Sequence, residues 1–475
     1  MPAHSTILKV FLILLILSAF SCAVNPVTGR NELMFVSEQQ EIAIGKDASP
    51  SANWEFGGEY HDPALQSYLN RIVKQLWTVS ERNHLPFEFH IQNSSIPNAF
   101  ALPGYVAITR GLLADMENEA QFAAVMGHEI GHVMARHTAQ RISKGMLQQL
   151  GLSVGAIALQ GSSGSDALLQ LGAIGSSLML LKYDREQELQ ADRLGVKYMS
   201  EIGYDPREAV EAHKVLERSA NNYMSRMKVS ARSDTFMSEL LSTHPRTSVR
   251  LEEINEMISV LPPYALRGDG KSANAFKRAK DQLSNKSTAY YTFDEAAQHL
   301  QKKEYSKAEG KVKEAIRLNG SEAIFHNLLG EIKLITKDFI AAETSFKKAV
   351  SLYPNFQPAV YGLGSAYFFG NKYSSAIEQF RFSISLYPQH ALSHFGLGKS
   401  YYELADYSKA IPYLKAFAGS APDHDEIHGL LGICFDRTQQ MQSAVIAYKN
   451  QLQVAPDTDL GRHARKRLAE INPIL

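Results

Sequence analysis

The chain has 475 residues, of which 45% are hydrophobic and 21% are charged, and its 49 lysines and arginines balance 49 aspartates and glutamates. This length corresponds to roughly two to four domains, and the composition is that of a globular protein. The zero net charge excludes a general electrostatic grip on nucleic acid, which needs a basic excess to neutralise phosphates. The two cysteines, Cys22 and Cys434, cannot make a disulfide framework.

Residues 1–21 have the pattern of a secretion signal. The apolar run at residues 10–17 is shorter than the about 20 residues that span a bilayer. Small residues stand three and one positions before Cys22, as in bacterial lipoprotein signals. We therefore expect cleavage before Cys22 and its acylation, with simple cleavage as the alternative. Ala23 follows the cysteine, so the expected location is the periplasm, with peripheral contact to the outer membrane through the lipid.

A short strand pattern precedes the first chemical motif. Residues 86–92 alternate apolar and polar side chains, which predicts a half-buried strand. Pro103-Gly104 is a turn signal, and residues 105–109 have the pattern of a returning strand. An edge strand before this turn could hold an extended substrate by main-chain hydrogen bonds. The residues expected to do so are Asn98, Ala99, Phe100 and Ala101.

A helix predicted to begin at Asn118 carries the sequence His128-Glu129-Ile-Gly-His132. Four residues advance a helix by about 6 Å and turn it by about 400°, so both histidines lie on one face and can bind one metal ion. Glu129 lies beside that face and can reach a metal-bound water. His137 is nine residues from His128, so on a straight helix it lies on the opposite side, where it packs or caps.

A second pair of residues completes the metal site. Glu188 and Asp192 are also four apart on a charged helical segment. The Glu188 carboxylate would complete a His, His, Glu set with an open fourth position, the arrangement of a catalytic zinc. Asp192 is then expected to accept the other N–H of a ligating histidine. The alternative is a pair of solvated acids on a helix surface.

Two further segments organise the chain less specifically. Residues 142–181 contain two apolar, Gly/Ser-rich stretches that are too short to span a bilayer. They are either two buried helices of the protease fold or a lid or membrane-facing hairpin over the cleft. Residues 266–288 interrupt the apolar pattern with Arg267-Gly-Asp-Gly and are expected to link two domains.

The last third of the chain repeats with a period of 34 residues. Glycines and prolines recur at this spacing, at Gly330, Gly364, Gly398 and Gly432 and at Pro354, Pro388, Pro422 and Pro456. This is the tetratricopeptide pattern, with a small residue where two helices cross and a proline after the second helix. We expect four regular repeats, a degenerate first one at about 290–320, and a polar capping helix. The concave face of such an array usually binds peptides or partner proteins; a spacer without ligand is the alternative.

Taken together, the motifs resemble a known family. Gly127-His-Glu-Ile-Gly-His-Val, Glu188-Leu-Gln-Ala-Asp192, Thr243-His244-Pro245, Asn25–Arg30 and Asn98–Pro103 resemble bacterial periplasmic zinc metalloproteases of the gluzincin type with C-terminal tetratricopeptide repeats. The resemblance implies that His128, His132 and Glu188 bind one zinc ion and that Glu129 is the general base. It also implies that the substrates are misassembled outer-membrane proteins.

His244 precedes a proline, which biases it toward a loop. It could stabilise the oxyanion as a hydrogen-bond donor. It could also be a switchable fourth zinc ligand that keeps the enzyme latent, because a closed four-ligand set leaves no position for water. We expect the switchable ligand; an exposed loop histidine is the remaining alternative.

The sequence therefore predicts an α+β zincin-like metalloprotease domain, mostly helical with a small sheet, at 22–265, a linker at 266–288, and an all-α tetratricopeptide-repeat superhelix at 289–475. The expected function is zinc-dependent endoproteolysis of unfolded or misassembled envelope proteins, with the repeats recruiting clients or the assembly machinery. The rival is a chaperone-like repeat scaffold with a structural metal site. Glu129 argues against this rival, because a structural site has no use for a base.

Overall fold

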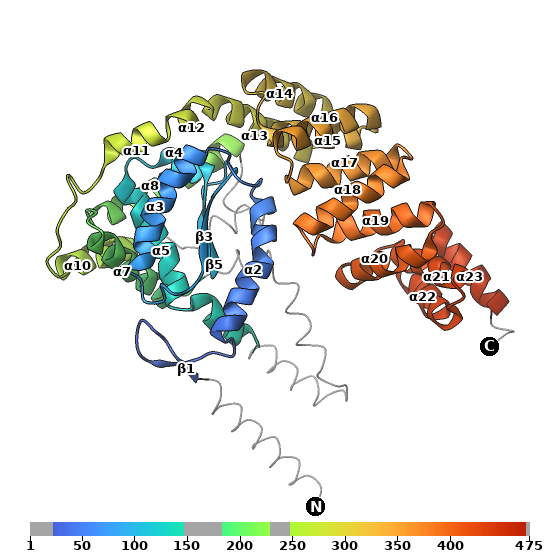
Figure 1. The fold of residues 1–475 in the computed structure, drawn as a ribbon, viewed down its shortest axis with the longest axis horizontal. Helices are drawn as coiled ribbons and strands as arrows, with labels where there is room; N and C mark the ends of the chain where they lie inside the picture. Colours follow the sequence, from blue (N-terminus) through green and yellow to red (C-terminus); the bar gives the residue numbers. More distant parts are fainter. Residues whose placement is uncertain (1–21, 147–182, 229–247, 472–475) are drawn as a thin grey trace, which may run out of the picture. The chain divides into compact units, whose positions relative to one another are not determined.

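The computed structural model describes residues 22–146, 183–228 and 248–471. The chain divides into two compact units, Met1–Ser287 and Thr288–Leu475 (Figure 1). The first is mostly helical with small sheets, and the second contains helices only in the part that is described. This confirms the predicted α+β unit followed by an all-α repeat unit. The signal pattern at 1–21, most of the apolar stretches within 142–181, and His244 lie outside the described residues.

The first unit contains two small sheets and the helices around them. A short antiparallel hairpin pairs β1 with β2 and sets Cys22 opposite Leu33. A second sheet has the strand order β3-β5-β4. The elements of this unit are β1 (Cys22–Val24), β2 (Asn31–Leu33), α2 (Glu38–Glu55), α3 (Pro63–Thr78), β3 (Phe87–Gln92), β4 (Ala99–Leu102), β5 (Gly104–Thr109), α4 (Arg110–Asp115), α5 (Glu119–Met134), α7 (Arg185–Glu201), α8 (Glu208–Met227), α10 (Ser248–Ser259), α11 (Ala273–Ala279) and α12 (Asp281–Asn285).

The three-stranded sheet combines both kinds of pairing. β5 lies in the middle, parallel to β3 and antiparallel to β4. Only one residue separates β4 from β5, and Gly104 has a positive φ of 92°, a conformation that favours glycine. β4 is therefore an edge strand of this sheet.

Helices cover both faces of β4. Phe100 and Leu102 pack in one cluster with Ala52 of α2 and with Phe56, the residue that follows this helix. α5 contacts the same strand, and Figure 1 shows α2 on one side of the sheet and α3 and α5 on the other. All four residues of β4 are buried. The β4 backbone is thus held next to α5, the helix that carries the two motif histidines.

The segment 266–288 is more than a connection. It contains α11 and α12, whose side chains Phe276 and Leu283 are buried. The Lys280 amine lies between these helices and donates hydrogen bonds to the carbonyls of Leu113, Ala114 and Met116 at the end of α4. Burial lowers the pKa of this amine to about 8. The segment that we expected to be a linker therefore packs on the first unit.

The second unit consists of successive helix pairs followed by a terminal helix. The second helices of the pairs begin 34 residues apart, at Tyr305, Phe339, Tyr373, Tyr407 and Met441. The helices are α13 (Ser287–Gln301), α14 (Tyr305–Leu318), α15 (Ala323–Ile335), α16 (Phe339–Leu352), α17 (Gln357–Phe369), α18 (Tyr373–Leu386), α19 (Ala391–Glu403), α20 (Tyr407–Ser420), α21 (Ile427–Arg437), α22 (Met441–Val454) and α23 (Asp459–Ile471).

The repeat glycines lie where paired helices touch. A Cβ at Gly330 would stand 2.7 Å from the Phe346 ring, and one at Gly432 would stand 2.5 Å from the Tyr448 ring. Such distances are shorter than van der Waals contact, so only glycine lets these helices pack. In α13 the small residue at this position is Ala296, which is fully buried.

None of the helices within the described ranges combines the length and the apolar character needed to cross a bilayer.

Candidate metal centre

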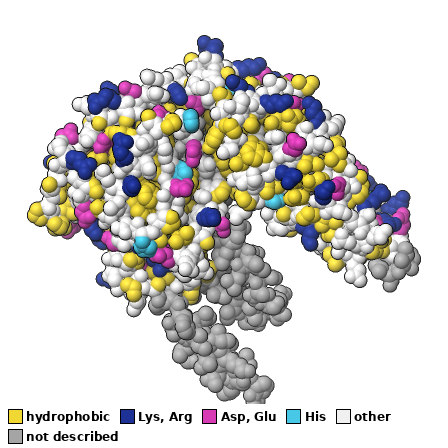
Figure 2. Space-filling view, in the orientation of Figure 1, with side chains coloured by type: hydrophobic (Ala, Val, Ile, Leu, Met, Phe, Trp, Pro, Cys, Tyr) yellow, Lys and Arg dark blue, Asp and Glu magenta, His cyan; other side chains and the backbone are white. Residues whose placement is uncertain are grey.

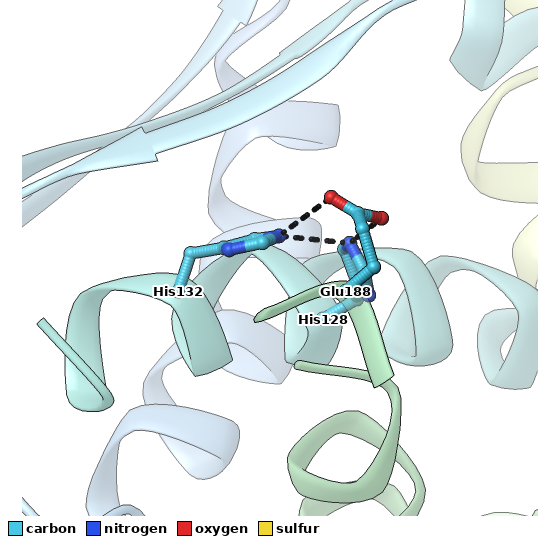
Figure 3. Close-up of side chains that lie close together, drawn as sticks. All are labelled: His128, His132 and Glu188. Atoms are coloured by element: carbon cyan, nitrogen blue, oxygen red, sulfur yellow. Dashed lines mark hydrogen bonds and ion pairs between the residues drawn. The ribbon is translucent and has the colours of Figure 1, made fainter. Parts of the chain in front are cut away.

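The two motif histidines and Glu188 converge in the first unit, where their ligand atoms all lie within 4.8 Å of one another (Figure 3). The Nε2 atoms of His128 and His132 are 3.1 Å apart, and each lies 3.6 Å from one oxygen of Glu188. In a tetrahedral zinc site with bonds of about 2.0–2.1 Å, neighbouring ligand atoms stand ~3.3 Å apart. The spacing and the types of these donors therefore fit a zinc ion.

Three glycines allow this convergence, because they let α5 and α7 cross at close range. A Cβ at Gly127 would lie 3.0 Å from Cα of Gly195, and one at Gly131 would lie 3.1 Å from the carbonyl oxygen of Ala191. A Cβ at Gly195 would in turn lie 2.9 Å from the backbone nitrogen of His128. Larger residues would push the helices apart and move Glu188 away from the histidines.

The start of α5 agrees with the helix predicted to begin at Asn118. The Asn118 side chain caps the helix by accepting a hydrogen bond from the backbone N–H of Gln121 at 2.9 Å. The Gln121 side chain accepts a hydrogen bond from the backbone N–H of Glu117 at 2.9 Å. Both side chains of the cap also donate to Glu208 of α8. The beginning of the histidine helix is therefore tied to a third helix.

Asp192 lies behind His128, one turn along α7 from Glu188. Its Oδ1 is 2.8 Å from Nδ1 of His128, and Nε2 of that ring faces His132 and Glu188. Burial by itself would raise the pKa of Asp192, but hydrogen bonds from His128, His213 and Arg250 hold it well below its ordinary value. Asp192 is thus a buried anion that orients the His128 ring.

Arg250 of α10 is a site residue that the motif analysis missed. Its guanidinium lies 2.6 Å from Oε2 of Glu188 and donates to both oxygens of Asp192 at 2.6 and 2.8 Å. The side chain is 3% exposed. Arg250 stands in α10, 58 residues after Asp192, and no local pattern in the sequence marks it. It supplies the positive charge that two buried carboxylates need.

The position of His137 differs from the one expected on a straight helix, so that prediction is wrong. The helix ends at Met134, and Arg136 has a left-handed φ of 59°, so the chain turns back. Nδ1 of His137 then lies 2.8 Å from Nδ1 of His132, and burial lowers the pKa of His137 to about 4. Tyr183 stacks on the His132 ring, with centroids 3.9 Å apart and an angle of 18° between the planes. The His132 ring is therefore packed on its face by Tyr183 and hydrogen-bonded at its edge by His137.

Glu129 is buried, with 5% of its surface exposed. Its charge acts on Arg250, which touches Glu188, and on Tyr183, which touches His132. Glu129 directly follows His128 on α5 and is not one of the three converging groups. The substrate residues expected at 98–101 lie at the start of β4, where the backbone nitrogen of Thr109 donates to the carbonyl of Asn98 at 2.9 Å. Cys22 is the first residue of β1.

Comparison with known families supports this interpretation of the site. Residues 63–258 match the model of Peptidase family M48, a range that includes His128, His132, Glu188 and Arg250. This part of the chain is similar to Peptidase family M48. Tetratricopeptide-repeat models match residues 323–356, 361–407 and 395–456. Both halves of the resemblance inferred from the motifs are confirmed.

Relatives of this domain occur in mitochondria and in bacteria. The chain is 30% identical over 240 residues to the mitochondrial metalloendopeptidase OMA1 of Schizosaccharomyces pombe, which covers 49% of this chain and 65% of the relative. It is 26% identical over 213 residues to the beta-barrel assembly-enhancing protease of Escherichia coli K12, which covers 44% and 42%. The chain therefore spans less than two thirds of either relative. In the solved structure of YrrB, a TPR protein with an unusual peptide-binding site, 98% of that chain aligns with 40% of this one at 19% identity and a TM-score of 0.35.

Proposed function

We propose that this protein is a zinc-dependent endopeptidase. The observation that carries the proposal is the convergence of His128, His132 and Glu188 in a domain that matches Peptidase family M48. Glu129, which is buried, directly follows His128 on the same helix. A zinc ion held there would polarise the scissile carbonyl and make the attacking water more acidic. Glu129 favours catalysis over the chaperone-like scaffold with a structural metal, because a purely structural site needs no base.

The remaining residues of the site have separate tasks in this proposal. The Glu129 carboxylate takes a proton from the attacking water and passes it to the nitrogen of the leaving amine. Asp192 orients His128, and Arg250 holds the two carboxylates of α7. The edge strand β4 can pair with an extended substrate by main-chain hydrogen bonds. Such pairing suits unfolded segments better than folded domains.

The roles of base and ligand are separated by two variants. Glu129→Gln should keep a stoichiometric zinc ion but lose cleavage of casein, because the amide cannot take a proton. His128→Ala should lose both the zinc ion and the activity. Zinc is measured by elemental analysis of the purified protein. A Glu129→Gln protein that comes back without zinc, or one that cleaves casein normally, contradicts the assignment.

We further propose that the clients are unfolded or misassembled envelope proteins, outer-membrane proteins in particular. The resemblance of the motifs and the name of the E. coli relative support this client class. The repeat unit also exposes hydrophobic side chains, some of them on the face in Figure 2. Ile340 is 82% exposed and Phe369 is 53% exposed. Deletion of 288–475 should preserve cleavage of casein but abolish cleavage of an unassembled outer-membrane protein; equal loss of both contradicts a recruiting role.

The mature protein is proposed to reside in the periplasm, attached to the outer membrane by acylated Cys22. The support is the lipoprotein-type pattern before this cysteine. Cys22→Ser should move the protein from the membrane fraction to the soluble periplasmic fraction. If the wild-type protein is already soluble, simple cleavage is correct and the anchor is wrong.

His244 remains a proposed switchable zinc ligand. Its place before Pro245 and the match of Thr243-His244-Pro245 to the family pattern support the proposal. His244→Ala should keep zinc through the other three ligands and cleave more loosely, its own chain included. An inactive His244→Ala protein with unchanged zinc coordination would favour the oxyanion role instead.

A further inference from the structure

His137 and Gln190 form a hydrogen-bonded chain that ends on a proposed metal ligand. Nδ1 of His137 is 2.8 Å from Nδ1 of His132, and Nε2 of His137 is 3.0 Å from Oε1 of Gln190. His137 is fully buried and His132 is 1% exposed, so water does not compete for these bonds. Gln190 lies on α7, two residues from Glu188. These hydrogen bonds therefore connect α5 and α7, the two helices that carry the proposed ligands.

The geometry is built by an unusual turn. Arg136 takes a left-handed conformation, which a non-glycine residue adopts at a cost in free energy. Its guanidinium donates to Oε2 of Glu41 at 2.9 Å and to the carbonyl of Val36 at 2.8 Å. Both acceptors belong to the segment around α2. The position of His137 is thus supported from outside the helix that it follows, and it does not depend on packing of its ring alone.

The direction of the hydrogen bonds decides whether His132 can bind a metal. A neutral imidazole carries one proton, so an Nε2 that faces a metal requires the proton on Nδ1. His132 must then donate to Nδ1 of His137. His137 must carry its own proton on Nε2 and donate it to the Gln190 oxygen. In the reverse direction, the Gln190 amide N–H₂ would donate to His137, and His132 would carry its proton on Nε2, where it blocks the metal.

The orientation of the Gln190 side chain agrees with the first direction. Its oxygen faces His137, and its buried amide nitrogen has no hydrogen-bond partner among the described residues. The other ligand histidine has a different partner, because Nδ1 of His128 meets the charged carboxylate of Asp192. His128 and His132 are therefore oriented by chemically different acceptors, one an anion and one a neutral ring.

We propose that His137 is a positioning residue: it donates its Nε2–H to Gln190, accepts a hydrogen bond from the Nδ1–H of His132, and so keeps that proposed ligand in the tautomer that binds metal. This inference rests on the proposed function only in that it takes His132 to be a zinc ligand. Its consequence is that zinc affinity depends on an acceptor at position 137 and on an acceptor at position 190. A ring that merely fills space would make neither demand.

The test measures zinc binding by the full mature chain in competition with a chromophoric chelator. His137→Leu, which fills space but accepts nothing, should weaken zinc binding by roughly 10–100-fold, the usual effect of removing a partner of a metal-binding histidine. His137→Gln offers an amide oxygen and should restore most of the affinity. Equal affinities of the leucine and glutamine variants, or a leucine variant within twofold of wild type, would overturn the proposal.

Gln190, at the far end of these hydrogen bonds, provides a matched pair of variants that leaves both histidines in place. Gln190→Glu can only accept and should bind zinc at least as tightly as wild type, whereas Gln190→Leu should bind less tightly. The same loss in both variants would overturn the proposal, and this pair also serves if His137→Leu does not fold. Failure of the proposed function is seen separately: wild-type protein that binds zinc but cleaves nothing leaves the His137 result intact.

Discussion

Replacement of Arg250 by glutamine tests the electrostatic design of the centre. Arg250 is buried and contacts both carboxylates of α7, at 2.6 Å for Glu188 and 2.6 Å for Asp192. Asp192 keeps hydrogen bonds from His128 and His213 when the guanidinium is lost, but Glu188 loses its ion pair. Removing one partner of a buried pair costs about 3–5 kcal/mol, because a charge is left without compensation.

The expected loss of stability in Arg250→Gln depends on whether zinc is bound. In a unit of this size about 1 kcal/mol lowers the melting temperature by roughly 2–4 °C, so metal-free Arg250→Gln should melt roughly 6–20 °C below wild type. A zinc ion compensates the Glu188 charge, so the loss should be less than half as large in the loaded protein. If the variant loses about 2 kcal/mol less stability in the zinc-loaded state than in the metal-free state, the folded variant binds zinc about 30-fold more tightly than the wild type does.

Calorimetry with a chelator and with zinc, together with a zinc competition titration, measures both quantities. Arg267→Gln is the control, because it removes the same charge from an exposed arginine whose side chain donates a long hydrogen bond, 3.3 Å, to Gln75. An equal drop in melting temperature with and without zinc would refute the idea that Arg250 and the metal ion both compensate the charge of Glu188. Weaker zinc binding by Arg250→Gln would show that ordering of the carboxylates outweighs their charge.

Two further predictions concern the repeat unit, each measured by urea unfolding. Gly362→Ala should cost roughly 1–3 kcal/mol, because its Cβ would stand 2.3 Å from the buried ring of Phe346, whereas Gly310→Ala, with no atom within 4 Å, should stabilise by roughly 0.5–1 kcal/mol. Equal effects would contradict this packing argument. Burial lowers the pKa of His390 to about 4, so the unfolded chain binds more protons between about pH 6.5 and 4. Stability should therefore fall by on the order of 3 kcal/mol as the pH drops through that window. This loss should disappear in His390→Gln and persist in His428→Gln.

Local patterns in the amino-acid sequence are sufficient for the parts of this protein that depend on neighbouring residues. His128 and His132 share a face because four residues make about one turn of any helix. The 34-residue period predicts small residues at the helix crossings, and in the structure the second helices of the pairs also begin 34 residues apart. These features follow from backbone geometry, which is the same wherever the helix lies in the fold.

The surroundings of the ligands depend instead on contacts between distant segments. Arg250 reaches Asp192 across 58 residues of chain, and no periodicity links the two. His137 faces His132 only because the helix ends at Met134 and the chain turns at Arg136, a conformation stabilised by contacts to Glu41 and Val36 about 100 residues earlier. Helix periodicity cannot anticipate either contact, since each is decided by how the completed unit buries and pairs its charges.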